Sequence, residues 1–138
     1  MIKKNYIIKK CYDAIQILEP KYLKYSKGQI TAKLHYCKFY IDSDQESGSF
    51  HIWYEGDITV NHRSDFDDFM EKVDSDHGPI GIISYEETPV QFSMGQYVYI
   101  DEDTDLEWLK NHIFQFSKVL NENIDLAYAH HVPITCHI

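Results

Sequence analysis

Residues 50–60 alternate between two sets of side chains, and this alternation constrains the fold more than any other feature of the sequence. Period-two alternation is typical of an antiparallel strand with one buried face. We expect the first set to face the core and the second set, which includes a tryptophan, to lie on the opposite face. The first set is Phe50, Ile52, Tyr54, Gly56, Ile58 and Val60, and the second is His51, Trp53, Glu55, Asp57 and Thr59.

The residues before this strand predict its partner in a long hairpin. Residues 30–41 are rich in apolar and aromatic side chains, and the polar stretch 42–48 has the composition of a solvated turn. The apolar parity changes near Tyr36, which predicts a β-bulge or burial on both faces. Ahead of the hairpin, we expect a short turn or helical piece through Tyr22, Leu23 and Tyr25, followed by a loop at Lys27 and Gly28.

Three segments have the apolar spacing of amphipathic helices. The first covers residues 5–19 and should end before Pro20, because proline disfavours the helical conformation of the residue before it. The second begins with Ser64 as its N-cap, and the third begins with a capping box from Thr104 to Glu107. The predicted stripes are Phe66, Phe69, Met70 and Val73 in the second helix, and Leu106, Leu109, Ile113, Phe116 and Leu120 in the third.

Further strands are expected at residues 80–85, 90–100 and 132–138. Gly95 should interrupt the middle one, and Pro133 should place the last at a sheet edge. Residues 121–131 fit either a continued helix or a loop. The pattern predicts an α+β fold for residues 1–138 as a single domain, with a mostly antiparallel sheet of about five strands packed against two or three helices.

Charge is distributed unevenly along the chain. Residues 1–38 hold nine lysines against Asp13 and Glu19, a balance of +7, whereas residues 39–138 hold three lysines and Arg63 against twenty carboxylates, a balance of −16. Such a field favours encounter with a basic partner and repels polyanions from most of the surface, although a high net charge also serves solubility alone. Lysines and tyrosines interleave near the N-terminus, but the acidic remainder argues against direct binding of nucleic acid.

The three cysteines indicate a reducing compartment, because they are widely spaced and odd in number. We therefore expect a cytoplasmic protein. The apolar N-terminal segment is interrupted by Lys9 and Lys10, so neither a signal peptide nor a membrane span is predicted.

No motif with a specific chemical mechanism is present. Phosphate-binding loops, GxSxG, HExxH and CxxC are absent from the sequence. The acidic runs 42–53 and 101–112 fail as calcium loops, because each lacks the required glycine and the twelfth-position glutamate. Neither a cofactor nor a metal is expected, because His130, His131, Cys136 and His137 lack the spacing of a zinc site.

Two function classes remain. In the first, the protein is an acidic antagonist that covers a basic site on a nuclease, a toxin or another nucleic-acid-handling protein, with Trp53 as an aromatic anchor. In size, acidity and general plan the chain resembles bacterial immunity proteins and phage inhibitors that mimic DNA, an analogy carried by no motif. The expected partner-binding residues are Trp53, Glu55, Asp65, Asp67, Asp68, Asp101, Glu102 and Asp103.

The alternative class is a small hydrolase or ligand-binding domain. A carboxylate can orient an imidazole as a base, and His62 lies near Asp65 while His77 lies near Asp74 and Asp76. A deep pocket around either ring would favour this class. Self-assembly is a third possibility, in which the basic N-terminal segment of one copy meets the acidic surface of another.

Overall fold

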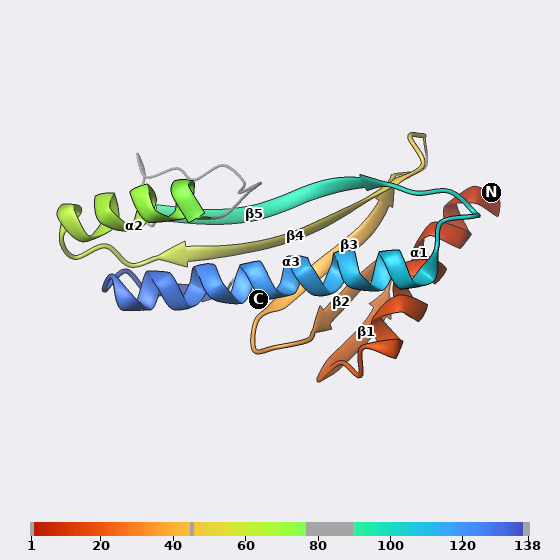
Figure 1. The fold of residues 1–138 in the computed structure, drawn as a ribbon, viewed down its shortest axis with the longest axis horizontal. Helices are drawn as coiled ribbons and strands as arrows, with labels where there is room; N and C mark the ends of the chain where they lie inside the picture. Colours follow the sequence, from red (N-terminus) through yellow and green to blue (C-terminus); the bar gives the residue numbers. More distant parts are fainter. Residues whose placement is uncertain (1, 45, 77–89, 137–138) are drawn as a thin grey trace.

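Strand β4 (Ser49–Ile58) lies inside the sheet (Figure 1). It pairs with three other strands. Strand β5 (Val90–Tyr99) runs antiparallel to β4 along its whole length. On the other edge of β4, β3 (Lys38–Asp44) pairs with the first half and β6 (Ile134–Cys136) with the second half. The predicted alternation is confirmed, because the buried residues of β4 include Phe50, Ile52, Tyr54, Gly56 and Ile58.

The computed structural model describes residues 2–44, 46–76 and 90–136. In this part of the chain it contains six strands and three helices, α1 (Ile2–Ile17), α2 (Arg63–Asp76) and α3 (Leu106–Ala129). The remaining strands are β1 (Tyr22–Ser26) and β2 (Gln29–Lys33), and the sheet order is β1-β2-β3-β4-β5 with β6 beside β4. All pairings are antiparallel, so the predicted α+β class is confirmed. The predicted strand at 80–85 lies outside the described residues.

Helices α1 and α3 pack against one face of the sheet, which we call the inner face. The ring of Phe116 in α3 meets that of Phe39 in β3 edge-on, with 5.9 Å between their centres. Both predicted helical stripes are present in the core, apart from their half-buried members Met70 and Leu106. The buried members are Phe66, Phe69 and Val73 in α2, and Leu109, Ile113, Phe116 and Leu120 in α3.

Residues 30–41 form parts of two strands rather than one bulged strand. Strand β2 ends at Lys33 and β3 begins at Lys38, so the change of parity near Tyr36 marks the turn between them. Each strand keeps its own alternation, and the buried residues face each other across the pair as Ile30 with Ile41 and Ala32 with Phe39. A change of parity alone does not distinguish a bulge from a short turn.

The segment predicted as a turn or helical piece, Tyr22–Tyr25, lies in the edge strand β1. A two-residue turn joins β1 to β2, and Lys27 and Gly28 both have positive φ, 54° and 79°. This is the geometry that matches the twist of a tight hairpin. In β1 only Leu23 is half-buried and the other residues are exposed, so the strand shows little alternation.

Several details of the helices and strands differ from the sequence prediction or were left open by it. Helix α1, for example, was expected over residues 5–19 and covers Ile2–Ile17. Asp105, not Thr104, caps α3, because its carboxylate accepts a hydrogen bond from the Glu107 N–H. Ser64 lies inside the first turn of α2, whose first N–H groups bond to the carbonyl of His62. Gly95 does not interrupt β5. Finally, α3 includes residues 121–129, where Ile124 and Ala127 prolong the buried stripe.

Candidate functional site

The outer face of the sheet, opposite α1 and α3, carries four aromatic rings in contact. We call Tyr40, His51, Trp53 and Tyr97 the aromatic stack. The ring of His51 lies nearly parallel to its two neighbours, with 4.7 Å to the centre of Trp53 and 4.4 Å to the centre of Tyr97. Tyr40 is tilted against Trp53, with 5.6 Å between the ring centres. The stack therefore crosses β3, β4 and β5.

Strand register explains why these rings meet. Tyr40 lies opposite Trp53 across the β3–β4 pair, and His51 lies opposite Tyr97 across the β4–β5 pair. Directly opposed side chains on one face of an antiparallel pair have Cβ atoms about 4.5–5.5 Å apart. The period-two pattern that buries the other face of β4 thus also builds the stack.

Gly95 lets the rings of the stack lie close to β5. It lies opposite Trp53, and a Cβ atom at this position would be 3.0 Å from Trp53 Cβ and 3.1 Å from His51 Nε2. A hollow of about 580 Å³ adjoins the stack, within the range of about 300–1,000 Å³ typical of ligand sites. Its lining residues are His51, Trp53, Glu55, Ser93, Met94, Gly95, Gln96 and Tyr97.

The stack is accessible from solvent. Tyr97 is 61% exposed, and His51 and Trp53 are half-buried although they lie in the centre of the sheet. Trp53 is therefore on the outer face as predicted, and it is partly covered by its aromatic neighbours rather than by a helix of the inner face. Accessible aromatic side chains rimmed by polar groups are characteristic of binding surfaces.

Carboxylates border the stack. Asp42 lies opposite His51 across the β3–β4 pair, and Glu55 is exposed on the far side of Trp53 along β4. Burial lowers the pKa of His51 below its ordinary 6.5, although Asp42 and Glu55 act in the opposite direction. Burial also raises the pKa of Asp42. The folded protein therefore favours the uncharged imidazole, which has the carboxylates of Asp42 and Glu55 near it.

A second group of predicted residues forms an acidic end of the molecule. The turn between β3 and β4 meets the loop between β5 and α3, where the Ile100 N–H donates to the carbonyl of Gly48 at 3.2 Å. Asp101, Glu102 and Asp103 are all exposed here, and together with Glu46 they line a shallow hollow. Asp101 accepts hydrogen bonds from the Asp103 N–H and the Thr104 hydroxyl, as expected of a structured turn. The described residues contain no group of carboxylates, histidines and cysteines arranged to hold a metal ion.

The carboxylates of α2 lie apart from this acidic end. Helix α2 follows the last residue of β4, whereas the acidic end borders the first, so the two lie at opposite ends of the strand (Figure 1). Asp67 pairs with Arg63 at 3.1 Å, Asp68 is exposed and Asp65 is half-buried. Of the carboxylates expected to bind a partner, Asp101, Glu102 and Asp103 thus lie together with the hairpin turn, whereas Asp65, Asp67 and Asp68 lie at the other end of β4.

Of the two histidines of the alternative hypothesis, the structure describes only His62, which it does not place in a pocket. His62 is exposed and lines neither the hollow beside the stack nor the groove next to α1, and His77 lies outside the described residues. Another pair, His35 Nδ1 and Ser117 Oγ, lies at 2.9 Å. Ser117 is fully buried and bonded to Asn121, so it is inaccessible to a substrate and joins α3 to the turn after β2.

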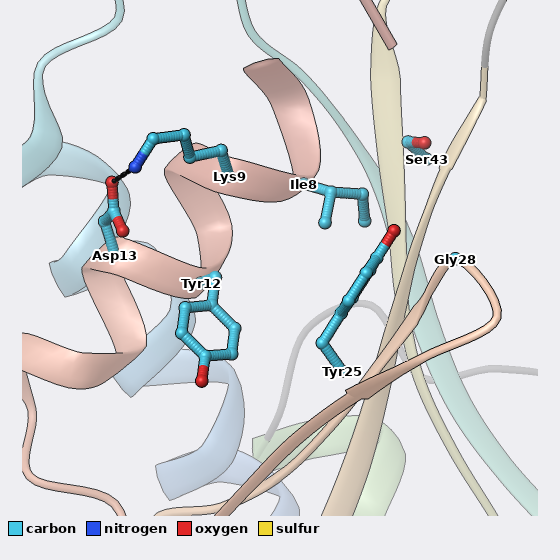
Figure 2. Close-up of a pocket in the computed structure, with 7 residues that line it drawn as sticks. All are labelled: Ile8, Lys9, Tyr12, Asp13, Tyr25, Gly28 and Ser43. Carbon is cyan, nitrogen blue, oxygen red and sulfur yellow. Dashed lines mark hydrogen bonds and ion pairs between the residues drawn. The ribbon is translucent and has the colours of Figure 1, made fainter. Parts of the chain in front are cut away.

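A groove of about 590 Å³ separates α1 from the β1–β2 hairpin. Figure 2 shows Tyr12 of α1 and Tyr25 of β1 on either side of it, with Ile8 between them. Lys9 and Asp13 pair at 3.0 Å on the helix surface (Figure 2). This groove was not predicted, because it exists only when Tyr22–Ser26 forms a strand. The weak alternation of that segment gave no signal of it.

No protein-family model, curated protein or solved structure matches this chain. The geometry of the site therefore carries the functional argument. No helix among the described residues is long and apolar enough to span a membrane.

The arrangement offers a surface for binding. The stack combines aromatic rings, an imidazole with a lowered pKa and a carboxylate at one accessible hollow. Aromatic side chains with limited rotamer freedom and complementary charge nearby are the usual hot spots of protein interfaces. Of the predicted residues, Trp53 and Glu55 lie at this site, and the other six lie at the two ends of the sheet.

Proposed function

We propose that this protein is a protein-binding antagonist that uses the aromatic stack to bind a basic surface of its partner. The observation that carries the proposal is the position of three contacting rings, His51, Trp53 and Tyr97, at an accessible hollow with Glu55 on its rim. The site lies in the part of the sequence whose charge balance is −16. A nuclease or another nucleic-acid-handling protein is the partner class whose functional site has the complementary charge.

The distribution of charge supports a partner that approaches along the acidic side. Long-range attraction raises association rates, whereas desolvated aromatic contacts slow dissociation. The acidic end and the α2 carboxylates lie beyond the stack on either side, so they act on the encounter even where they make no contact. This division of roles explains why both kinds of residue serve one function.

Affinity capture from the protein's own source tests the proposal. The bait is the untagged protein, and the matched baits are Tyr97→Ala and, as control, Tyr128→Ala, which alters an exposed tyrosine of α3. We expect a basic protein that the wild type and Tyr128→Ala retain at low salt, that high salt weakens, and that Tyr97→Ala retains poorly. The recovered protein should lose its nucleic-acid-processing activity when the wild-type bait is added.

Two outcomes would overturn the proposal. One is the absence of any protein that distinguishes the wild type from Tyr97→Ala. The other is a salt-sensitive dimer of the protein that Tyr97→Ala dissolves in sedimentation, since a second copy would then occupy the face. The outer face carries Lys33 and Lys38 toward β2 and β3 and Glu55 toward β5, so this outcome is a meaningful alternative.

A further inference from the structure

The hollow beside Trp53 has three kinds of wall. Along the β4–β5 pair, His51 lies opposite Tyr97, Trp53 opposite Gly95, and Glu55 opposite Ser93. The hollow is therefore lined by the rings of His51 and Tyr97 toward one end, by the indole of Trp53, and by the carboxylate of Glu55 with Ser93 toward the other end. Aromatic and anionic groups thus line one accessible hollow of the outer face.

This combination selects a planar cation. Aromatic faces attract cations through their quadrupole, and a guanidinium stacks on such faces while its fork of donors bonds to a carboxylate. An ammonium is more strongly hydrated and lacks the planar shape. Among the described residues Glu55 has no ion pair, so its carboxylate can accept hydrogen bonds from a bound cation.

The uncharged imidazole of His51 adds a further contact for such a cation. Its Nε2 atom lies above Gly95, within 3.1 Å of where a Cβ atom would stand. A neutral imidazole offers one acceptor nitrogen, which the donors of a guanidinium can use. The outer face already holds one cation over a ring, because Lys38 Nζ lies 4.7 Å from the centre of Tyr22.

We infer that the hollow beside Gly95 binds an arginine side chain of the protein partner, in contact with the aromatic rings that line it and paired with Glu55. This inference rests on the proposed function and specifies its contact chemistry. The guanidinium anchors the complex, and the acidic surroundings exclude partners that present carboxylate or phosphate at the same place. The hollow thus selects partners that present an arginine at this one position of a basic surface.

Fluorescence titration with two short peptides tests the inference. Both peptides alternate glycine with a basic residue and carry the same charge, one with arginine and the other with lysine. Trp108→Phe leaves Trp53 as the single tryptophan, so the emission reports on the hollow. We expect the arginine peptide to alter Trp53 emission and to bind several-fold more tightly than the lysine peptide.

Matched variants locate the binding. In the Trp108→Phe background, Tyr97→Ala should weaken the arginine peptide about 2- to 5-fold, whereas the exposed control Tyr128→Ala should not. Glu55→Gln should remove most of the preference for arginine, and Glu122→Gln, an equal change of charge on α3, should leave it. Tyr97 and Glu55 are exposed, so both variants should fold, as circular dichroism will verify.

The failures of the two proposals are distinguishable. Equal binding of both peptides, or an arginine preference that survives both Tyr97→Ala and Glu55→Gln, would overturn the arginine inference. The partner found by affinity capture would still stand in that case. Its basic surface would then bind without one specific arginine as an anchor. Conversely, arginine-selective binding in the hollow with no partner that depends on Tyr97 would support the site and contradict the proposed function.

Discussion

Gly95 is the residue on which the site most depends. It was expected to break β5, but the strand continues through it because both of its neighbours are paired with β4 and the rings of His51 and Trp53 cover the place of its side chain. Local preference against glycine in a strand is small, about 1 kcal/mol, and cross-strand packing overrides it.

Gly95→Ala should therefore disturb the stack. The new methyl group would press on His51, on Trp53 and on the carbonyl of Ile52, all at 3.0–3.1 Å. Overpacking of this kind costs about 1–3 kcal/mol of unfolding free energy, which urea denaturation would measure. Gln91→Ala, at an exposed outer position of the same strand, serves as control and should change stability by less than about 0.5 kcal/mol. Equal stability of the two variants would mean that the rings move aside freely.

His51 should make the stability of the protein depend on pH. Its pKa is lowered in the folded state, chiefly by burial, so the unfolded chain takes up the proton first as the pH falls below 6.5. The contribution of His51 to the unfolding free energy is thus fully present above pH 6.5. It declines as the pH falls toward the pKa of the folded state, because the unfolded state then binds more protons. Asp42 faces His51 from β3, and its pKa is raised above 3.8 in the folded state. At pH values just above 3.8 the folded protein therefore binds the Asp42 proton more readily than the unfolded chain, so this carboxyl favours stability as the pH falls. Glu55, on β4, is the other carboxylate that acts on the imidazole.

Denaturation at a series of pH values checks this sign. His51→Gln should flatten the decline just below pH 6.5, and it should raise the pKa of Asp42 further, because the imidazole opposes that shift. His62→Gln, at an exposed position before α2, should leave the curve as in the wild type. A wild-type curve that is flat between pH 5 and 7 would show that His51 titrates normally.

At the scale of elements, the sequence predicted the segments that alternate strongly and missed those held by tertiary contacts. The alternation of β4 and the stripes of α2 and α3 are dictated by burial of one face, which leaves a readable period. Strand β1 has no such period, because it lies at the edge and covers little. The end of α3 was ambiguous in sequence because polar residues interrupt its stripe, and Asn121 and Asn123 are nevertheless buried.

Asn121 shows how one element holds another. Its side-chain oxygen accepts hydrogen bonds from the N–H groups of Tyr36 and Cys37, and its amide donates to the carbonyl of Ser117 at 2.7 Å. Asn121→Ala would leave the buried Cys37 N–H without a partner. We expect a loss of about 1–3 kcal/mol in unfolding free energy by denaturant titration. Asn111→Ala, on the exposed side of the same helix, should cost far less.

At the scale of the whole molecule, charge and contact are separated in space. The stack lies on β3, β4 and β5, whereas the two acidic groups flank it at opposite ends of β4. The sequence predicted which residues are acidic and that Trp53 faces outward. It did not predict that His51 and Tyr97 join Trp53, because this depends on the register of β4 with β5, which residues 50–60 alone do not specify.

Neutralising the α2 carboxylates separates encounter from contact. The triple variant Asp65→Asn, Asp67→Asn and Asp68→Asn should slow association with the captured partner and flatten its salt dependence, and should leave the dissociation rate nearly unchanged. Tyr97→Ala should raise the dissociation rate and leave the association rate and its salt dependence nearly unchanged. Surface-based kinetics at two salt concentrations measures both rates. Unchanged association in the triple variant would remove α2 from the account.

The central claim is that the aromatic stack, rather than the carboxylates at either end of the sheet, is where a basic partner binds. Site-resolved amide chemical shifts during titration with the arginine peptide test it most directly. The account predicts that the largest changes fall on residues 51–55 and 93–97, with smaller ones at the acidic end and in α2. Changes confined to residues 46–48 and 101–103, or spread evenly over the carboxylates, would contradict it.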